Sequence, residues 1–312
     1  MNGNKLPSHI KRISFALCVI LTFGCGRKYP IPPESQYGMP PEESYVLVDE
    51  WPDDNSYELH DIMDVIVGKD GFIYVVTANN LYKLFENGQL DRILVTGFSS
   101  AAAVDQDILR HIYVVDDEIV KMFDRTGSLL YSFEDTTLVT PSGIASDGET
   151  IFISDMYRNL VLSYDSSGTI VDTVASYGAG ILNVAAPHDL CIWYDRIFVV
   201  STAHNWVEAI TIDTPRANLL HLGGTTHDGD TLPGYFINPV DVAVDDSGYV
   251  YVADAGNSRI QKFDRYGNFV IEVELTDTPI SVACSHDGKT LYVGFNNRIE
   301  KYRRPERPSQ PQ

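Results

Sequence analysis

The chain has 312 residues, of which 44% are hydrophobic and 11% aromatic, which is enough apolar material for a large core. Its formal net charge of −20 at pH 7 repels phosphate backbones and argues against a nucleic-acid partner. Acidic side chains also keep a protein soluble, or attract cations where carboxylates converge, and the net charge alone does not separate these two roles.

The first 25 residues have the pattern of a targeting segment. Three basic residues precede an apolar stretch, residues 13–23, whose eleven residues fit a signal peptide and fall short of the ~20 needed to span a bilayer. The segment ends in "TFGC", which resembles the lipobox of bacterial lipoproteins, with Gly24 before a Cys25 that would be lipidated. It departs from that pattern at Thr22, where Leu is typical, and at Phe23, where a smaller residue is typical. An ordinary secretory signal or an uncleaved anchor are the alternatives.

Proline-rich segments flank the central part of the chain. Residues 26–44 contain five prolines and predict an extended tether between a lipid anchor and a folded domain at residues 45–303. The tail, residues 304–312, has a composition typical of disorder. Gly26 follows Cys25 in place of the Asp that often retains lipoproteins at the inner membrane. The pattern predicts a lipid-anchored protein of the periplasmic cell envelope, at the outer membrane.

A unit of about 40 residues recurs six times in the central part. The clearest copy, residues 238–270, reads "NPVDVAVDDSGYVYVADAGNSRIQKFDRYGNFV", and the others begin at residues 62, 100, 140, 186 and 278. Each copy has an apolar run, a tight turn, a β-rich strand, a polar loop, a third strand, a second turn and a fourth strand. Because such units bury their faces only by stacking radially, the repeat predicts an all-β six-bladed β-propeller with four antiparallel strands per blade.

The units resemble NHL repeats, most closely at residues 238–270, and the resemblance implies a six-bladed propeller with a binding role. The second and fourth copies depart from it, with "ILR" and "YDR" where the turn glycine should be. The sixth copy ends near Tyr302 without a fourth strand, whereas "SYVLVDEW" (residues 44–51) is a strand without a unit. We therefore predict that this N-terminal strand closes the last blade and hides its edge.

In such a propeller the residues aligned with Val240-Asp241 lie on the strands nearest the axis, on the face that carries the loops between second and third strands. The aligned pairs are Met63-Asp64, Ser100-Ala101, Ser142-Gly143, His188-Asp189, Val240-Asp241 and Ile280-Ser281. Three of the carboxylates, those of Asp64, Asp189 and Asp241, are expected to point toward one axis at the channel mouth. A hard cation such as Ca²⁺ would bridge them, or each would instead accept hydrogen bonds from a neighbouring backbone amide.

His188 is the fourth candidate at the channel mouth. Some NHL-like lyases place a histidine at this position in several blades and so hold zinc, but here only one copy has it, and one histidine does not make a tetrahedral site. His188 is therefore either a ligand or base in the channel or a polar rim residue. The sequence leaves open whether Ca²⁺, Zn²⁺ or any other cofactor is bound.

The loops between second and third strands supply the binding-face candidates. His204, Asn205 and Trp206 break the loop pattern of the fourth copy, and an exposed tryptophan beside polar groups suits a sugar or peptide surface. The alternative is that Trp206 packs between blades. Asn257 lies in the corresponding loop of the fifth copy. By contrast, Asp116, Asp155 and Asp254 recur at the end of the second strand, which indicates a structural role.

The sequence favours a binding scaffold over an enzyme. It has no G-x-S-x-G, H-E-x-x-H or phosphate-binding glycine motif. We expect a protein, peptide or glycan ligand of the cell envelope to bind the face with the long loops, on which rigid blades hold the binding residues. Two alternatives stay open: a metal-assisted lyase or hydrolase with its site at the channel mouth, and a structural subunit of an envelope assembly.

Overall fold

The computed structural model describes residues 44–52, 57–178, 180 and 182–305. The lipobox cysteine Cys25, the tether up to residue 43 and the tail beyond residue 305 lie outside these residues, so the predictions made for them stay predictions. Within the described part of the chain, no helix has the length and apolar character that crossing a membrane requires.

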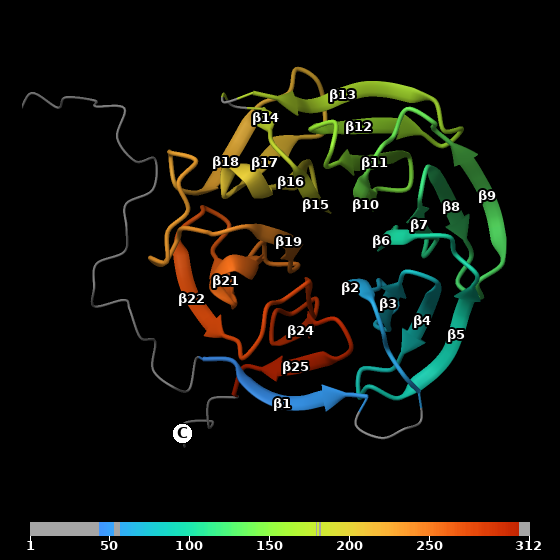
Figure 1. Ribbon diagram of the computed structural model, residues 1–312, viewed down its shortest axis with the longest axis horizontal. Coiled ribbons are helices and arrows are strands. Elements are labelled where there is room, and N and C mark those ends of the chain that lie inside the picture. The colour runs from blue at the N-terminus through green and yellow to red at the C-terminus, as the bar shows by residue number, and fades with distance from the viewer. Residues whose placement is uncertain (1–43, 53–56, 179, 181, 306–312) are drawn as a thin grey trace, which may run out of the picture.

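The chain forms six antiparallel sheets arranged around a central axis, which confirms the predicted six-bladed propeller (Figure 1). Within each blade, strands are ordered from the axis outward. Blade 1 consists of β2 (Ile62–Val67), β3 (Ile73–Thr77), β4 (Asn80–Leu84) and β5 (Leu90–Thr96). Blade 2 consists of β6 (Ala101–Gln106), β7 (Ile112–Asp116), β8 (Ile119–Phe123) and β9 (Leu129–Glu134). Blade 3 is β10 (Pro141–Ser146), β11 (Thr150–Asp155), β12 (Leu160–Asp165) and β13 (Ile170–Tyr177), to which the short β14 (Asn183–Val184) adds in parallel. Blade 4 consists of β15 (Pro187–Trp193), β16 (Arg196–Ser201), β17 (Trp206–Thr211) and β18 (Asn218–Gly223). Blade 5 consists of β19 (Pro239–Val244), β20 (Val250–Asp254), β21 (Arg259–Phe263) and β22 (Phe269–Glu274).

The sixth blade joins the two ends of the propeller. Its inner strands are β23 (Ser281–Cys284), β24 (Thr290–Gly294) and β25 (Ile299–Arg303), and its outer strand is β1 (Val46–Trp51), which pairs antiparallel with β25. Figure 1 shows this blue strand lying along the red sixth blade. The prediction that the N-terminal strand closes the last blade is therefore confirmed.

The core consists of apolar layers between neighbouring blades. The second strands β3, β7, β20 and β24 are buried along their whole length, because each is covered on both faces by adjacent blades. This explains their runs of Val, Ile, Leu and Tyr in place of a strict alternation. In one layer, Tyr74 and Val76 of blade 1 pack with Phe98, Val104 and Phe123 of blade 2. Each blade is thus stabilised by its neighbours.

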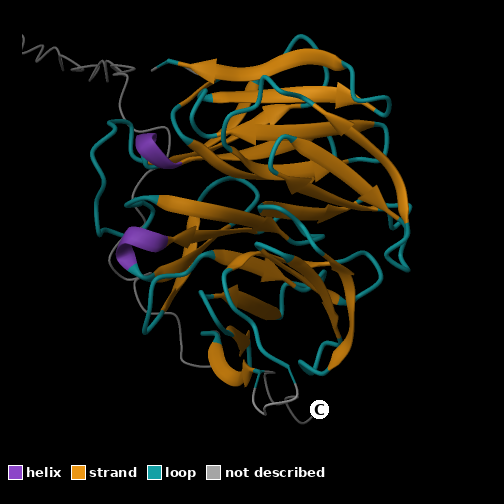
Figure 2. Ribbon diagram, turned by 45° about the vertical axis from the view of Figure 1, so that its right-hand side comes forward, coloured by secondary structure: helices purple, strands orange, loops and turns teal. Residues whose placement is uncertain are grey.

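The two faces of the propeller differ. We call the face with the tight turns between first and second and between third and fourth strands (for example residues 68–71 and 264–267) the turn face. The opposite face, with the loops between second and third strands and the connections between blades, is the loop face. Both short 3₁₀ helices, η3 (Thr202–His204) and η4 (Ala255–Asn257), lie on the loop face, on one side of the molecule in Figure 2.

Buried aspartates at the ends of second strands organise the loop face. Asp116 accepts hydrogen bonds from the amides of Ser99 and Ser100, both at 2.8 Å. Asp155 and Asp254 accept equivalent bonds at 2.8 Å from the amides of Val139 and Ile237. Each aspartate fixes the connection that enters its own blade. The structural role expected for Asp116, Asp155 and Asp254 is therefore confirmed.

Candidate functional site

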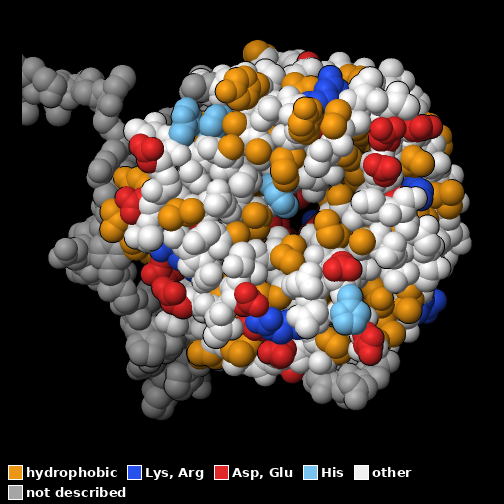
Figure 3. Space-filling view, in the orientation of Figure 1, with side chains coloured by type: hydrophobic (Ala, Val, Ile, Leu, Met, Phe, Trp, Pro, Cys, Tyr) orange, Lys and Arg blue, Asp and Glu red, His pale blue; other side chains and the backbone are white. Residues whose placement is uncertain are grey.

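A funnel of about 440 Å³ runs along the axis from the middle of the inner strands to the turn face. Its lining comes from the inner strands and from the first turn of several blades, including Lys69, Ile108, Asp147, Tyr194, Asp246 and His286. None of it comes from the loops between second and third strands. The funnel therefore opens on the face opposite to the one that the sequence pointed to. Figure 3 views the opposite, loop face, where a small opening is visible at the hub with charged side chains inside it.

Two of the predicted channel aspartates connect neighbouring blades. Asp64 accepts hydrogen bonds from the amide of its neighbour Val65 at 2.6 Å and from the amide of Val104, in the next blade, at 3.0 Å. Asp241 likewise binds the amide of Val282 in the next blade at 2.6 Å. Their carboxylate oxygens are therefore engaged by backbone amides, which is the alternative to a bridging cation.

Burial raises the pKa of two of the three inner-strand carboxyls, those of Asp64 and Asp189. Burial raises the pKa of Asp64 to about 7, and the charge of Asp241 adds to the effect. Burial also raises the pKa of Asp189 well above its usual value, followed by the charge of Asp241 and a hydrogen bond between the two carboxyl groups. Asp189 and Asp241 are thus hydrogen-bonded neighbours, and the charge of Asp241 also acts on Asp64.

His188 lies outside the funnel lining and is half-buried. Burial lowers its pKa, while the charge of Asp241 and a hydrogen bond to the backbone of Val240 act in the opposite direction. Among the described residues, no group of three or more His, Cys, Asp or Glu side chains is arranged to hold a metal ion.

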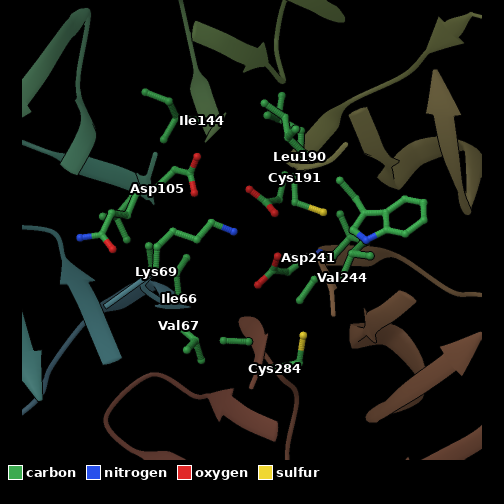
Figure 4. Close-up of a pocket in the computed structure, with 18 of the residues that line it drawn as sticks. Ile66, Val67, Lys69, Asp105, Ile144, Leu190, Cys191, Asp241, Val244 and Cys284 are labelled. Atoms are coloured by element: carbon green, nitrogen blue, oxygen red, sulfur yellow. Dashed lines mark hydrogen bonds between the residues drawn. The ribbon is translucent and has the colours of Figure 1, made fainter. Parts of the chain in front are cut away.

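Four charged residues of the funnel were not anticipated from the sequence: Lys69, Asp105, Asp147 and Asp246. Asp105, on β6, accepts a hydrogen bond from the amide of Ser146 at 2.7 Å, and burial raises its pKa to about 6. Lys69, from the first turn of blade 1, extends into the funnel between Asp105 and Asp241 (Figure 4). It forms no ion pair with a described residue. Lys69 is the one lysine among six aspartates in the described lining.

The remaining wall of the funnel is apolar. Ile66, Val67, Ile144, Leu190 and Val244 contribute aliphatic surface (Figure 4). Two free cysteines complete the lining, and burial raises the pKa of both the Cys191 and Cys284 thiols. These thiols therefore stay protonated at neutral pH and behave as small apolar groups. Apolar walls with a few converging polar groups are typical of small-molecule sites.

Most loop-face candidates are packed against other residues. Trp206 is only 4% exposed, so it does not form the exposed platform considered from the sequence. Its ring lies 4.3 Å from that of His204 and 5.0 Å from that of His227. Asn205 binds the carbonyl of His227 at 2.8 Å, and Asn257 binds the carbonyl of Asp230 at 3.1 Å. These side chains hold the long connection of residues 224–238 against blades 4 and 5.

Comparisons with known proteins agree with this architecture. The NHL repeat family model matches residues 236–263, which lie in blade 5 where the sequence repeat is clearest. No curated protein sequence matches the chain.

Several solved structures share the fold at low sequence identity. An auxiliary nutrient binding protein from Bacteroides ovatus is 14% identical over 85% of this chain and 74% of its own, with a TM-score of 0.63. A streptogramin B lyase is 11% identical over 83% of this chain and 97% of its own, with a TM-score of 0.58. A chain of a nidogen/laminin complex is 17% identical over 71% of this chain and 84% of its own, also at 0.58. At these identities the likeness concerns the fold alone. The chain is a six-bladed β-propeller that contains an NHL repeat in its fifth blade.

Proposed function

We propose that the protein is an exported, lipid-anchored binding protein that captures a ligand with a cationic group in the axial funnel. The observation that carries this proposal is the composition of the funnel, in which six aspartates and a single lysine surround an apolar-walled space of about 440 Å³. The raised pKa values of Asp64 and Asp189 reduce the negative charge of the funnel but leave an excess of carboxylates over Lys69. A ligand that places a positive group inside the funnel is therefore favoured.

The leader and the tether support the envelope location. A lipidated Cys25 followed by a proline-rich tether would hold the propeller near a membrane while leaving both faces free to meet ligands. The nutrient binding protein is one structural neighbour with a binding role. The geometry favours binding over the metal-assisted chemistry considered from the sequence, because the oxygens of Asp64 and Asp241 are engaged by backbone amides.

The proposal is tested by calorimetry on the purified protein with three probes of similar length. Cadaverine carries two ammonium groups, pentanediol is neutral and glutarate is anionic. We expect measurable binding of cadaverine only. Asp105→Asn, which keeps an acceptor for the amide of Ser146, should weaken cadaverine binding about tenfold, since about 1.4 kcal/mol of lost attraction corresponds to that factor.

Two further variants complete the test. Lys69→Met should strengthen cadaverine binding, because it removes a repelling charge from the funnel. Asp228→Asn, an exposed change of the same charge on the loop face, is the matched control and should leave the affinity unchanged. Equal affinity for cadaverine and pentanediol, or no effect of Asp105→Asn, would refute a cation-selective funnel.

A further inference from the structure

A second depression of about 630 Å³ lies on the turn face beside the funnel, between blades 4 and 5. We call it the seam groove, and it is lined by Trp193, Tyr194, Asp246, Ser247, Tyr249, Asp264, Arg265 and Tyr266. Three of these residues, Trp193, Tyr194 and Asp246, also line the funnel. The two spaces therefore form one continuous surface that runs from the axis toward the outer edge of the propeller.

The seam groove presents an unusual number of exposed aromatic side chains. Tyr194 is 78% exposed and Tyr266 is 64% exposed, and Tyr249 is also exposed. Large aromatic side chains gathered on one exposed surface are typical of recognition sites, because each offers a rigid contact area with a polar tip. On the loop face, Trp206 is buried, and Tyr157 is exposed by 74% in the loop of blade 3.

The walls of the seam groove are held in place by the fold. Trp193 packs so closely against blade 5 that a Cβ atom on Gly248 would lie 2.7 Å from its ring. Arg196 lies over the ring of Trp193, with its guanidinium carbon 5.2 Å from the ring centroid. Asp264 accepts the amide of Tyr266 at 2.9 Å and so fixes the turn that carries this tyrosine. A groove organised before binding loses little entropy when a ligand enters.

Charge identifies the kind of occupant. The funnel lining has six aspartates and one lysine and so attracts a cation. The seam groove is less one-sided, because Arg265 lies there beside Asp246 and Asp264. A small amine would fill the funnel and leave the aromatic wall empty. A chain that carries one cationic side chain beside apolar or aromatic ones would use both parts.

We propose that the natural ligand is a peptide segment whose lysine or arginine side chain enters the funnel while the following residues lie in the seam groove. This inference rests on the proposed cation-binding funnel and adds the ligand class and the path of its chain. Contacts to Tyr194, Tyr249 and Tyr266 would add to the affinity that the funnel provides for the cationic side chain.

The test compares two mixtures of short peptides with blocked ends on the immobilised full-length protein. One mixture has Lys at a fixed central position and random neutral residues elsewhere, and the other has Glu at that position. Mass spectrometry of the bound fraction should show enrichment of the Lys mixture, with aromatic or large apolar residues selected on one side of the lysine. The best peptide is then measured by calorimetry beside cadaverine.

Tyr266→Ser separates the groove from the funnel, because Tyr266 lines the groove only. It should lower the ratio of peptide affinity to cadaverine affinity about tenfold. An unchanged ratio, equal enrichment of the Glu mixture, or displacement of the peptide by neutral hexasaccharides would overturn the peptide assignment while cadaverine binding still upholds the funnel. Failure of cadaverine itself would reject the proposed function.

Discussion

Single buried carboxylates fix the positions of whole connections in this protein. Among them, Asp254 accepts hydrogen bonds from the most partners. It accepts the amide of Ile237 at 2.8 Å, the side chain of Asn257 at 2.8 Å and the guanidinium of Arg259 at 2.8 Å. Arg259 continues the network to the carbonyls of Thr231 and Tyr235. One aspartate therefore ties blade 5 to the connection that precedes it.

We expect Asp254→Ala to lower the free energy of unfolding by about 3 kcal/mol, because it leaves a buried arginine without one of its two carboxylate partners. Urea unfolding of the purified protein, followed by circular dichroism, measures the change. Asp228→Ala, in an exposed part of the same connection, should stay within about 0.5 kcal/mol of the parent. A loss for Asp254→Ala as small as that of the control would show that the network is dispensable.

At the level of single residues, the repeat indicated which positions of the inner strands to consider for the site. Asp64, Asp189 and Asp241 occupy equivalent inner-strand positions, which is why they were grouped. Asp105 was missed because it lies two residues further along its strand: Ala103, opposite Val115, is the equivalent of Asp241 opposite Ala253, and Asp105, opposite Tyr113, is the equivalent of Ala243. Lys69 lies in a Gly-Lys-Asp-Gly turn, and a turn signal shows where the chain reverses but not where a long side chain extends.

At the scale of elements, the long connection of residues 224–238 depends on stacked imidazoles. The rings of His204 and His227 lie 4.4 Å apart and nearly parallel, at an interplanar angle of 18°. His221 and Glu208 lie in the same cluster and are 3.3 Å apart. Burial lowers the pKa of His204, and His227 and His221 act in the same direction while Glu208 opposes them.

We expect acid to release this connection. Because the folded-state pKa of His204 lies below its unfolded value, its contribution to stability is present above about pH 6.5 and is lost as the pH falls through the folded pKa. Amide hydrogen exchange, corrected for the intrinsic effect of pH, should show less protection for residues 224–238 at pH 5 than at pH 7.5.

The control for the acid response is His204→Phe, which keeps an aromatic ring between Trp206 and His227 but cannot be protonated. Protection of residues 224–238 should then vary much less with pH. The same loss of protection in the parent and in His204→Phe would assign the acid response to another group of this cluster, which also contains His227, Glu208 and His221.

The packing of Trp206 could not be read from its own sequence neighbourhood. A tryptophan at the start of a strand, after a polar pair, is exposed or buried according to what covers it. Here the cover comes from His227 and from the connection that follows blade 4, about twenty residues further along the chain. Local pattern predicted the strand correctly, whereas burial depended on the path of a distant loop.

At the scale of the whole molecule, the repeat determined the number of blades, the order of strands and the closure of the last blade. It did not determine the face on which the axial space widens. That depends on the size and direction of side chains from six strands at once. Toward the turn face the lining comes from residues as different as Lys69, Tyr194 and His286, each from the turn of a different blade, and no single repeat contains this information.

Closure by β1 is the feature on which the whole propeller depends. Trp51 is 1% exposed and packs with its ring 5.6 Å from that of Tyr292 in the sixth blade. The hydroxyl of Tyr45 lies 3.2 Å from that of Tyr251 and donates to the carbonyl of Gly288. The N-terminal strand thus covers both the edge of β25 and the layer between blades 5 and 6.

We expect a chain that starts at residue 44 to fold and a chain that starts at residue 53 to aggregate, because loss of β1 exposes the hydrogen-bonding edge of β25. Within the full chain, Trp51→Ala should lower the free energy of unfolding by about 3–5 kcal/mol, as expected for a large aromatic side chain removed from a core. Val48→Ala, at a position that is 50% exposed in the same strand, should cost far less. Size-exclusion chromatography and urea unfolding measure both effects. A soluble monomer from the chain that starts at residue 53, with an unchanged unfolding midpoint, would mean that the five complete blades and three remaining strands close the circle without the N-terminal strand.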